Sequence, residues 1–555
     1  MLHLLVVLST LMVPDVPFPF AVTHASSDRV ELMPDDAAIV ALRPFDRARL
    51  TRMTKVSLPA SVVGGPVALR LTREEVAIAA GAFHLDGRPT GVDPSEGMSI
   101  WTGVVEGVAR SEVFLALSPH GSWGWIDVGE DRLHLLTERT AQGRRSAWVT
   151  EGWALAHQSA PNLRCETEST SLPSGRAPTA ASIGAGGAGG AGQPPLKAGA
   201  SGTILKVRFA LETDWHFFSL FGDEMATAAY SVAIIGASNS RYREQVDVVL
   251  AIDYLGIHSN PNDGWTQTDI GGDCYAVLGE FMSAWSPGAA PVPADIYHFF
   301  TGANTFCAIA SGDVCDAGGA YSIMGKMDGL SSFPPAPGPL NWDFVWFCHE
   351  TGHNFGSPHT HSYCPPLDEC APTGWFGPCQ SAQNCITNGT FMSYCHACPG
   401  GMSNFTTWFH TGVVPVLRAT AESGCLTPFE GVLTTDLGFG LSGAIGTPEL
   451  VISYSENPDQ VNFEVGHGPT SQSGLFISST SAIYQTFLGV GTLVPAPTFL
   501  VGATTGANGR VSFAVPIQVS VPNGITLFTQ AWFLDPAGPS GYAASNAIEW
   551  ELIRP

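Results

Sequence analysis

The sequence predicts a multidomain fold in which an α/β domain stands between two β-rich domains. The chain has 555 residues, enough for about three or four domains of ordinary size. Residues 166–202 are rich in Gly, Ala and Pro and have almost nothing to bury, which is typical of a linker. Strand-like alternation dominates before this linker and near the C-terminus, whereas helical and strand patterns alternate directly after it.

Residues 1–25 have the pattern of a secretory signal peptide. Residues 4–13 form an apolar run, Pro14 interrupts it, and Ala25 fits a small-residue cleavage site. A buried segment of a domain that begins at Met1 is the alternative interpretation. Such a run is too short to cross a bilayer, which needs about 20 apolar residues, and we find no longer uninterrupted one. We therefore expect a secreted protein without a membrane span.

The charge balance excludes two classes of partner. Lys and Arg number 25 and Asp and Glu 49, so the formal net charge is −24. Such a surface repels phosphate groups, so we expect neither a nucleic-acid-binding protein nor a polybasic membrane-surface protein. The hydrophobic share of 45% is enough to build cores, which excludes a disordered chain.

Alternation of apolar and polar residues marks the two β-rich domains, at residues 26–165 and 430–555. In the first domain, strands are expected over 99–105, 113–117 and 123–128. In the second, a period of two runs from Val511 to Val521 and returns at Ile548, Trp550 and Leu552. The second domain therefore resembles a β-sandwich accessory domain.

Residues 203–428 alternate between strand and helix patterns. The expected strands are 204–211, 246–252 and 296–300, and the expected helices are 225–243 and 274–285. Alternating elements of this kind predict an α/β layer structure.

The distribution of the 12 cysteines is informative. Cys165 is the only cysteine in the first 270 residues, and the others lie between Cys274 and Cys425. This clustering predicts either disulfides in an oxidising compartment or a cysteine-rich metal site, and the signal peptide favours disulfides. If Cys165 is not a partner, the number of remaining cysteines is odd, so one thiol stays unpaired. Cys348, which faces into an apolar helix, is the expected free thiol.

The strongest chemical signal is a histidine motif. On a helix, His349 and His353 lie one turn apart on the same face, so both imidazoles can reach one ion. Glu350 is adjacent and suits a general base for a metal-bound water. Gly356 allows a sharp turn that brings His359 back as a third nitrogen ligand. Three nitrogens with an open fourth position predict a catalytic zinc site.

A second motif, Gly-Thr-Phe-Met-Ser-Tyr, follows at residues 389–394. Alone, Met392 would more often be a core residue. Together with the extended motif of residues 349–359, it resembles the Met-turn of the metzincin metalloproteases, where a methionine forms an apolar floor beneath the zinc. Within that clan, His-Glu-Thr-Gly-His-Asn-Phe-Gly-Ser-Pro-His is most similar to the reprolysin (adamalysin) family and its bacterial reprolysin-like members. The resemblance covers residues 203–428.

The resemblance implies an α/β metzincin catalytic domain with a mixed sheet and an active-site helix. It also implies endopeptidase activity on protein or peptide substrates, with one catalytic Zn²⁺ and Glu350 as the general base. Unlike reprolysins, the chain has Thr360 and His361 where an Asp usually follows the third ligand. Tyr394 is shared instead with astacins and serralysins, and we expect it to donate to the tetrahedral oxyanion or to ligate zinc at rest. His361 is expected behind the ligands or at the surface.

The resemblance gives a role to three further features. Metzincin zymogens often hold a prodomain thiolate on the zinc, and Cys165 is placed to do this; an ordinary disulfide or a free thiol is the alternative. Gly319, Ala320 and Tyr321 are expected in the edge strand that pairs with substrate backbone, although an ordinary strand fits them equally. Glu212 would help to bind a structural Ca²⁺, as an acidic residue of the first strand does in reprolysins.

We therefore expect a secreted zinc endopeptidase made as a zymogen. Its parts are a signal peptide, a β-rich prodomain, a linker, a catalytic domain and a β-sandwich tail, at residues 1–25, 26–165, 166–202, 203–428 and 430–555. A surface adhesin or matrix-binding protein with an inactive protease module is an alternative, but the intact Glu350 argues against it. A zinc hydrolase of non-peptide amides is another, and the clan resemblance favours peptides over it.

Overall fold

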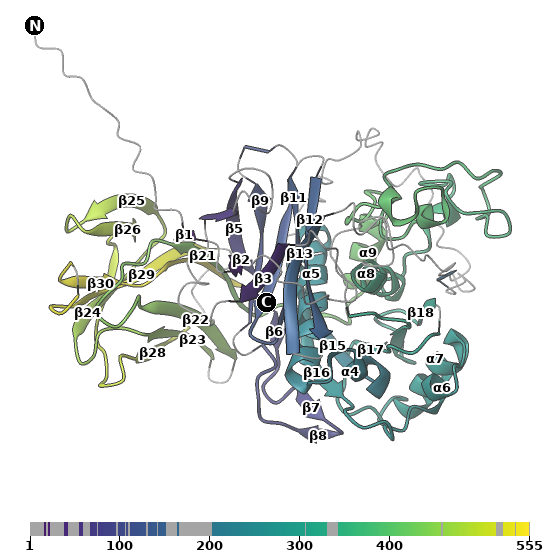
Figure 1. The fold of residues 1–555 in the computed structure, drawn as a ribbon, viewed down its shortest axis with the longest axis horizontal. Coiled ribbons are helices and arrows are strands. Elements are labelled where there is room, and N and C mark those ends of the chain that lie inside the picture. Colours follow the sequence, from purple (N-terminus) through teal and green to yellow (C-terminus); the bar gives the residue numbers. More distant parts are fainter. Residues whose placement is uncertain are drawn as a thin grey trace, which may run out of the picture.

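The structure is a computed structural model, and it shows a mixed α/β protein with several sheets and few helices (Figure 1). In Figure 1 the C-terminal strands lie on the left, the N-terminal sheet at the centre and the α/β domain on the right. The residues that the structure describes are 16–17, 20–22, 38–42, 55–58, 67–74, 76–95, 98–105, 107–108, 111–128, 131–140, 143–150, 164–165, 203–305, 307–329, 342–456, 459–517, 525–538 and 540–553.

The N-terminal sheet has the strand order β1-β4-β5-β9-β10-β11-β12-β13-β3-β2. The three predicted strands are confirmed as β9 (Ser99–Val105), β10 (Val113–Ser118) and β11 (Gly121–Val128), which pair antiparallel. The others are β1 (Val16–Pro17), β2 (Phe20–Val22), β3 (Ala38–Leu42), β4 (Lys55–Leu58), β5 (Val67–Glu74), β12 (Asp131–Thr140) and β13 (Gly143–Thr150). Strands β1 and β2 fall within the segment predicted to be a signal peptide.

The sheet of the α/β domain has the order β14-β18-β19-β17-β15-β16-β7-β8. Strands β15, β16, β17 and β19 run parallel, and β18 runs antiparallel to β19. The strands are β14 (Arg164–Cys165), β15 (Leu205–Thr213), β16 (Val248–Ile257), β17 (Ile296–Phe300), β18 (Cys307–Ser311), β19 (Ala320–Met324) and the short β20 (Thr427–Pro428), which pairs with β15. The predicted mixed sheet is therefore present.

Six α-helices surround or follow this sheet in the described part of the chain. They are α4 (Trp215–Phe221), α5 (Glu224–Val246), α6 (Thr266–Asp269), α7 (Cys274–Ala284), α8 (Trp342–Asn354) and α9 (Val414–Ala421). Helix α5 is the helix predicted over 225–243. It begins where the Asp223 carboxylate accepts the N–H of Ala226 at 2.8 Å and ends before Asp247, whose φ is 53°. These two caps fix its length.

The N-terminal domain is less separate than the sequence predicts. Three short strands from it, β6 (Ala77–Ile78), β7 (Phe83–Leu85) and β8 (Arg88–Pro89), extend the α/β sheet beyond β16. Both β6 and β7 pair in parallel with β16. The physical reason is that β16 would otherwise present an open edge of unpaired backbone groups.

The C-terminal domain has three described sheets: β25 and β26 form a separate pair, and the two larger sheets share one core. The strand orders are β21-β31-β29-β24-β27 and β22-β23-β28, and aromatic residues of both sheets, including Phe463 and Phe476, meet between them. The alternation predicted at the C-terminal end is confirmed, because Ile548, Trp550 and Leu552 are buried. The strands are β21 (Gly431–Gly438), β22 (Glu449–Glu456), β23 (Asp459–Gly466), β24 (Ser473–Ser479), β25 (Ala482–Phe487), β26 (Gly491–Pro495), β27 (Phe499–Thr504), β28 (Val511–Pro516), β29 (Thr526–Leu534), β30 (Tyr542–Ala544) and β31 (Ala547–Ile553).

The described cysteine side chains other than Cys348 form disulfides. Pairs join Cys315 to Cys425, Cys364 to Cys379, Cys370 to Cys395 and Cys385 to Cys398. Cys274 is also disulfide-bonded. Cys348 is a buried free thiol, as predicted. The side chain of Cys165 lies outside the described residues.

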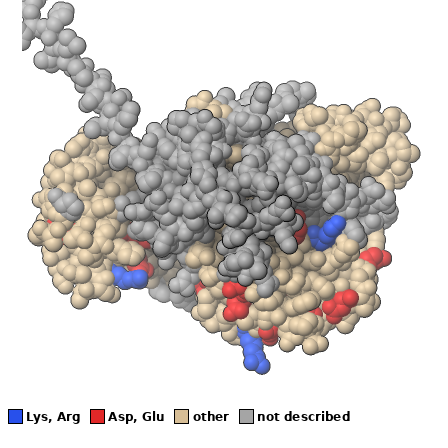
Figure 2. All heavy atoms as spheres, in the orientation of Figure 1, with Lys and Arg blue, Asp and Glu red and all other residues tan. Residues whose placement is uncertain are grey.

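The described surface carries few charged residues (Figure 2), as the charged share of 13% in the sequence predicts. On the face shown in Figure 2, single acidic residues are spread over the α/β domain, basic residues stand apart from one another, and most of the described surface is uncharged. Among the described residues, no helix is long and apolar enough to cross a bilayer.

Candidate active site

Helix α8 carries two of the predicted ligands and the predicted base. Its first turns are apolar and buried, from Phe344 to Phe347, so the helix runs through the core of the domain. His349 and His353 are four residues apart and lie on one face of the helix. Glu350 is fully buried beside them.

The chain reverses direction directly after α8. Gly356 has a φ of +76°, in the left-handed region that favours glycine. Its N–H donates to the carbonyl of His353 at 2.8 Å, which closes the end of the helix. The turn returns the chain so that His359, just before the short helix η3 (Thr360–Ser362), faces α8.

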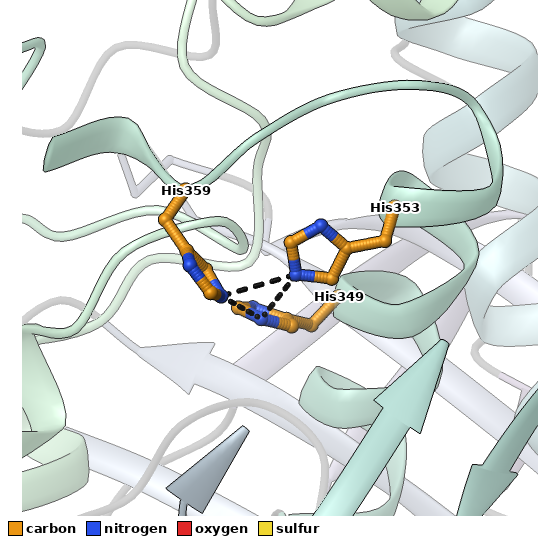
Figure 3. Close-up of side chains that lie close together, drawn as sticks. All are labelled: His349, His353 and His359. Carbon is orange, nitrogen blue, oxygen red and sulfur yellow. Dashed lines mark hydrogen bonds between the residues drawn. The ribbon is translucent and has the colours of Figure 1, made fainter. Parts of the chain in front are cut away.

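The three predicted histidines meet at their Nε2 atoms (Figure 3). The Nε2 atom of His353 lies 3.2 Å from that of His349 and 3.1 Å from that of His359. The remaining separation, between His349 and His359, is 3.2 Å. All three side chains are buried, so the nitrogens converge inside the protein.

The hydrogen bonds of the rings show that this triangle fits a metal ion. Nδ1 of His349 bonds to the carbonyl of Phe391, and Nδ1 of His353 bonds to that of Ser357 at 2.8 Å. A carbonyl can only accept, so in both rings Nδ1 holds the proton and Nε2 presents a lone pair. Lone pairs that face one another repel unless a cation lies between them. Tetrahedral zinc with bonds of about 2.0–2.1 Å would hold its nitrogens about 3.3–3.4 Å apart.

Burial keeps these imidazoles neutral, as metal ligands must be. It lowers the pKa of His353 to about 4. It also lowers the pKa values of His349 and His359 well below the usual value, and the neighbouring rings lower them further.

Met392 lies directly against the active-site helix. A Cβ atom at Gly352 would lie 2.5 Å from Sδ of Met392 and 3.3 Å from the ring of Phe409. A larger residue at this position would therefore require the Met392 side chain to move away from the helix. The carbonyl of Met392 accepts the N–H of Thr360 at 2.9 Å, which ties this turn to the segment that carries His359.

Tyr394 and His361 pack against the third histidine. The ring of Tyr394 lies 4.6 Å from that of His359 and 4.9 Å from that of His361. The rings of His359 and His361 are nearly parallel, at 12° and 5.1 Å. His361 is buried and lies behind the ligands, which is the first of the two placements expected for it.

Two contributors to the site were not predicted from the sequence. The indole of Trp346 packs 4.4 Å from the ring of His349. Its spacing of three residues before His349 on a helix is the signal that could have identified it. The carbonyl of Phe391 orients His349, and because it is a backbone group, no side-chain pattern could reveal it.

The edge strand next to the site is β18, not β19, so the prediction for Gly319, Ala320 and Tyr321 is wrong. Gly319 precedes β19, and β19 hydrogen-bonds to β17 on one side and to β18 on the other. No side of β19 is free to accept a substrate strand. The outer side of β18 carries β14 instead, with Cys165 paired in register with Ala308.

The predicted calcium site receives no support from the structure. The Glu212 carboxylate accepts a hydrogen bond from His258 at 2.6 Å. Burial raises the pKa of Glu212, and the same hydrogen bond and charge raise the pKa of His258 although burial opposes this. Among the described residues, no further ligand groups gather around Glu212.

Comparisons with known proteins concern the same region. The sequence model Reprolysin_5, described as metallo-peptidase family M12, matches residues 205–406. None of the curated proteins matches the chain.

Several solved structures are similar at low identity. Metalloproteinase-II from Bacteroides fragilis is 9% identical, with a TM-score of 0.33, and the match covers 59% of this chain and 86% of that protein. Wild-type OgpA from Akkermansia muciniphila is 10% identical, with a TM-score of 0.20 and coverage of 64% and 97%. Catalytically inactive OgpA in complex with an O-glycopeptide substrate is 10% identical, with a TM-score of 0.17 and coverage of 64% and 96%.

Proposed function

We propose that the α/β domain, whose residues 205–406 match metallopeptidase family M12, is a zinc-dependent endopeptidase that is secreted as a zymogen. The observation that carries this proposal is the buried triangle of Nε2 atoms from His349, His353 and His359, separated by 3.1–3.2 Å. The disulfides support secretion, because such bonds persist in oxidising compartments.

The residues of the site have distinct roles in this proposal. Zinc, when bound, lowers the pKa of a water molecule and polarises the scissile carbonyl. The three histidines hold the metal, and Phe391 and Ser357 fix the orientation of two of their rings. A carboxylate oxygen of Glu350 takes the proton of the attacking water and passes it to the leaving amine nitrogen.

The β18 strand favours peptides over other amide substrates. An extended peptide can pair with the edge of a sheet through its own backbone, and only a polypeptide offers a repeating set of such groups. Strand β18 is also linked to the active-site helix, because the side-chain amide of Asn354 donates to the carbonyl of Gly312 at 2.9 Å. A substrate strand that replaced β14 would therefore run beside the histidines.

A digest of casein or gelatin tests this function. After cleavage of the linker, the protein should degrade both substrates, and a zinc chelator should stop the reaction. An adhesin with an inactive protease module would degrade neither protein, whether or not the chelator is present. A hydrolase of non-peptide amides would spare both proteins yet release amine from small amides in a chelator-sensitive way.

Tyr394→Phe is expected to lower kcat far more than it changes KM. The hydroxyl is proposed to donate a hydrogen bond to the tetrahedral oxyanion, and loss of one such donor costs about 10²–10³-fold in kcat. Steady-state kinetics on a fluorogenic peptide measures both constants. The matched control is Tyr363→Phe, which removes a nearby hydroxyl bonded to Ser357 at 3.1 Å and should leave kcat nearly unchanged. An unchanged kcat in Tyr394→Phe would make Tyr394 a packing residue.

The uncut chain is expected to be nearly inactive, and cleavage within residues 166–202 should activate it. Two features support this: β14 covers the outer side of β18, and Cys165 lies in β14 directly before the linker. If the thiolate of Cys165 caps the zinc, Cys165→Ser should raise the activity of the uncut chain, because a hydroxyl is a far poorer zinc ligand. A mercurial should do the same.

Cys348→Ser is the control for this latency experiment, since Cys348 is a free thiol buried in the core. That variant should stay as latent as the parent. The thiolate mechanism would be wrong if Cys165 forms a disulfide in the uncut protein, or if Cys165→Ser is equally latent. Latency would then come from steric cover of β18 by β14.

A further inference from the structure

We infer that the N-terminal domain stays bound to the α/β domain after the linker is cut, so that the activated protein is a complex of two chains. In the proposed zymogen the segment around β14 causes latency, whereas the contacts of the N-terminal domain extend over a much larger surface. The inference rests on that proposal for the role of β14, but the association of the two fragments does not depend on peptidase activity.

The first contact is a set of backbone hydrogen bonds within one sheet. The N–H of Ala79 donates to the carbonyl of Ile252, and that of Asp86 donates to the carbonyl of Ile257, both at 2.8 Å. In return, the N–H of Leu255 donates to the carbonyl of Ala82 at 2.8 Å. Ala79, Ala82 and Asp86 lie far upstream of the linker and their partners lie well after it, so cleavage at residues 166–202 leaves these bonds in place.

The second contact is an apolar face of α5. Every residue from 226 to 242 is buried, whereas a surface helix would bury only one stripe. The N-terminal sheet covers the remaining side: the ring of Trp123 lies 5.2 Å from that of Tyr230. A Cβ at Gly236 would lie 2.5 Å from Cδ1 of Ile100, so the Ile100 side chain of the N-terminal sheet packs against the backbone of α5.

The third contact consists of two ion pairs across the same interface. Arg241 of α5 bonds to Glu112 of the N-terminal domain, and its guanidinium lies 4.1 Å from the ring centroid of Trp408. The Arg241 side chain is only 5% exposed. Arg243 bonds to Glu74 at 2.6 Å, and the Glu74 side chain is equally buried. Separation of the domains would break both ion pairs together with the packing around them, which slows dissociation.

The inhibitory segment has a much smaller contact among the described residues. There, β14 contributes two residue pairs to the sheet, Arg164 with Cys307 and Cys165 with Ala308. Once the linker is cut, β14 lies near a chain end and is covalently joined to the rest of the protein on its N-terminal side only. It can therefore leave β18 while β6, β7 and the sheet over α5 remain attached. Activation then needs release of a strand, not release of a domain.

The test uses the full chain with a recognition site for a specific protease inserted in the Gly/Ala run of the linker. A Glu350→Gln background prevents self-digestion without changing the interface. After complete cutting, shown on a denaturing gel, size exclusion with light scattering should give one species with the mass of the uncut chain. Separation of the two fragments, as soluble species or with one of them precipitated, would overturn the inference.

A variant of the interface makes the test specific. Glu112→Gln in the cut protein should raise the dissociation rate at least about tenfold, because Arg241 loses its partner. The matched control is Asp93→Asn, an exposed carboxylate of the same domain that bonds only locally to Ser95. Equal dissociation rates for the two variants would remove the ion pair from the explanation of the complex.

Discussion

Glu350→Gln is expected to lower kcat/KM for a peptide substrate by about 10²–10⁴-fold while zinc binding and the fold are retained. Glutamine has the size and shape of glutamate, and Glu350 is fully buried, so the packing of α8 should change little. Its amide cannot accept the proton of the attacking water, so the substitution slows only the chemical step. Kinetics on the linker-cut protein, together with metal analysis of the same sample, measures both quantities.

Glu422→Gln is the matched control for this substitution. Glu422 lies in the same domain and pairs with Arg418 at 2.8 Å, and its side chain is 45% exposed. Exposed pairs of this kind contribute little to stability, so the control should keep its full activity and zinc content. Substantial turnover in Glu350→Gln would show that another group is the base. Loss of zinc from it would instead place Glu350 among the ligands.

His359→Ala is expected to remove most of the bound zinc and nearly all activity. His359 supplies one corner of the triangle, at 3.1 Å and 3.2 Å from the other two Nε2 atoms. Loss of a residue that merely supports a ligand costs about 10–100-fold in metal affinity, so loss of the ligand itself should cost more. A competition titration with a zinc-binding dye measures the affinity.

His361→Phe separates ligation from packing in this experiment. The His361 ring stacks 5.1 Å from that of His359, and phenylalanine would keep an aromatic ring there. The zinc affinity of this control should stay close to that of the parent. A parental affinity in His359→Ala would remove His359 from the ligand set and leave a site of only two described imidazoles.

The sequence predicts the part of the site that depends on local geometry. A spacing of four residues places His349 and His353 on one helix face whatever surrounds the helix. A glycine after the helix permits the turn that returns His359, and the φ of Gly356 shows this turn. The long elements α5 and β16 were also predictable, since a long apolar segment is itself a local property of the sequence.

Features that depend on pairing between distant segments were not predictable. Strands β6, β7 and β8 are only two or three residues long, which is too short to show a period. Their place beside β16 follows from an open sheet edge that no local pattern reveals. The error in the edge strand has the same origin: the segment of β19 was expected at the edge, and only the hydrogen bonds of the sheet show that β18 lies outside it.

A zinc titration tests the central claim most directly. The linker-cut protein is stripped of metal with a chelator, the chelator is removed, and peptidase activity is recorded as zinc is added back. We expect no activity in the stripped protein and a linear recovery that saturates at one zinc per chain. Activity that survives complete removal of the metal, or that zinc does not restore in a protein that remains folded, would contradict the assignment of a zinc endopeptidase.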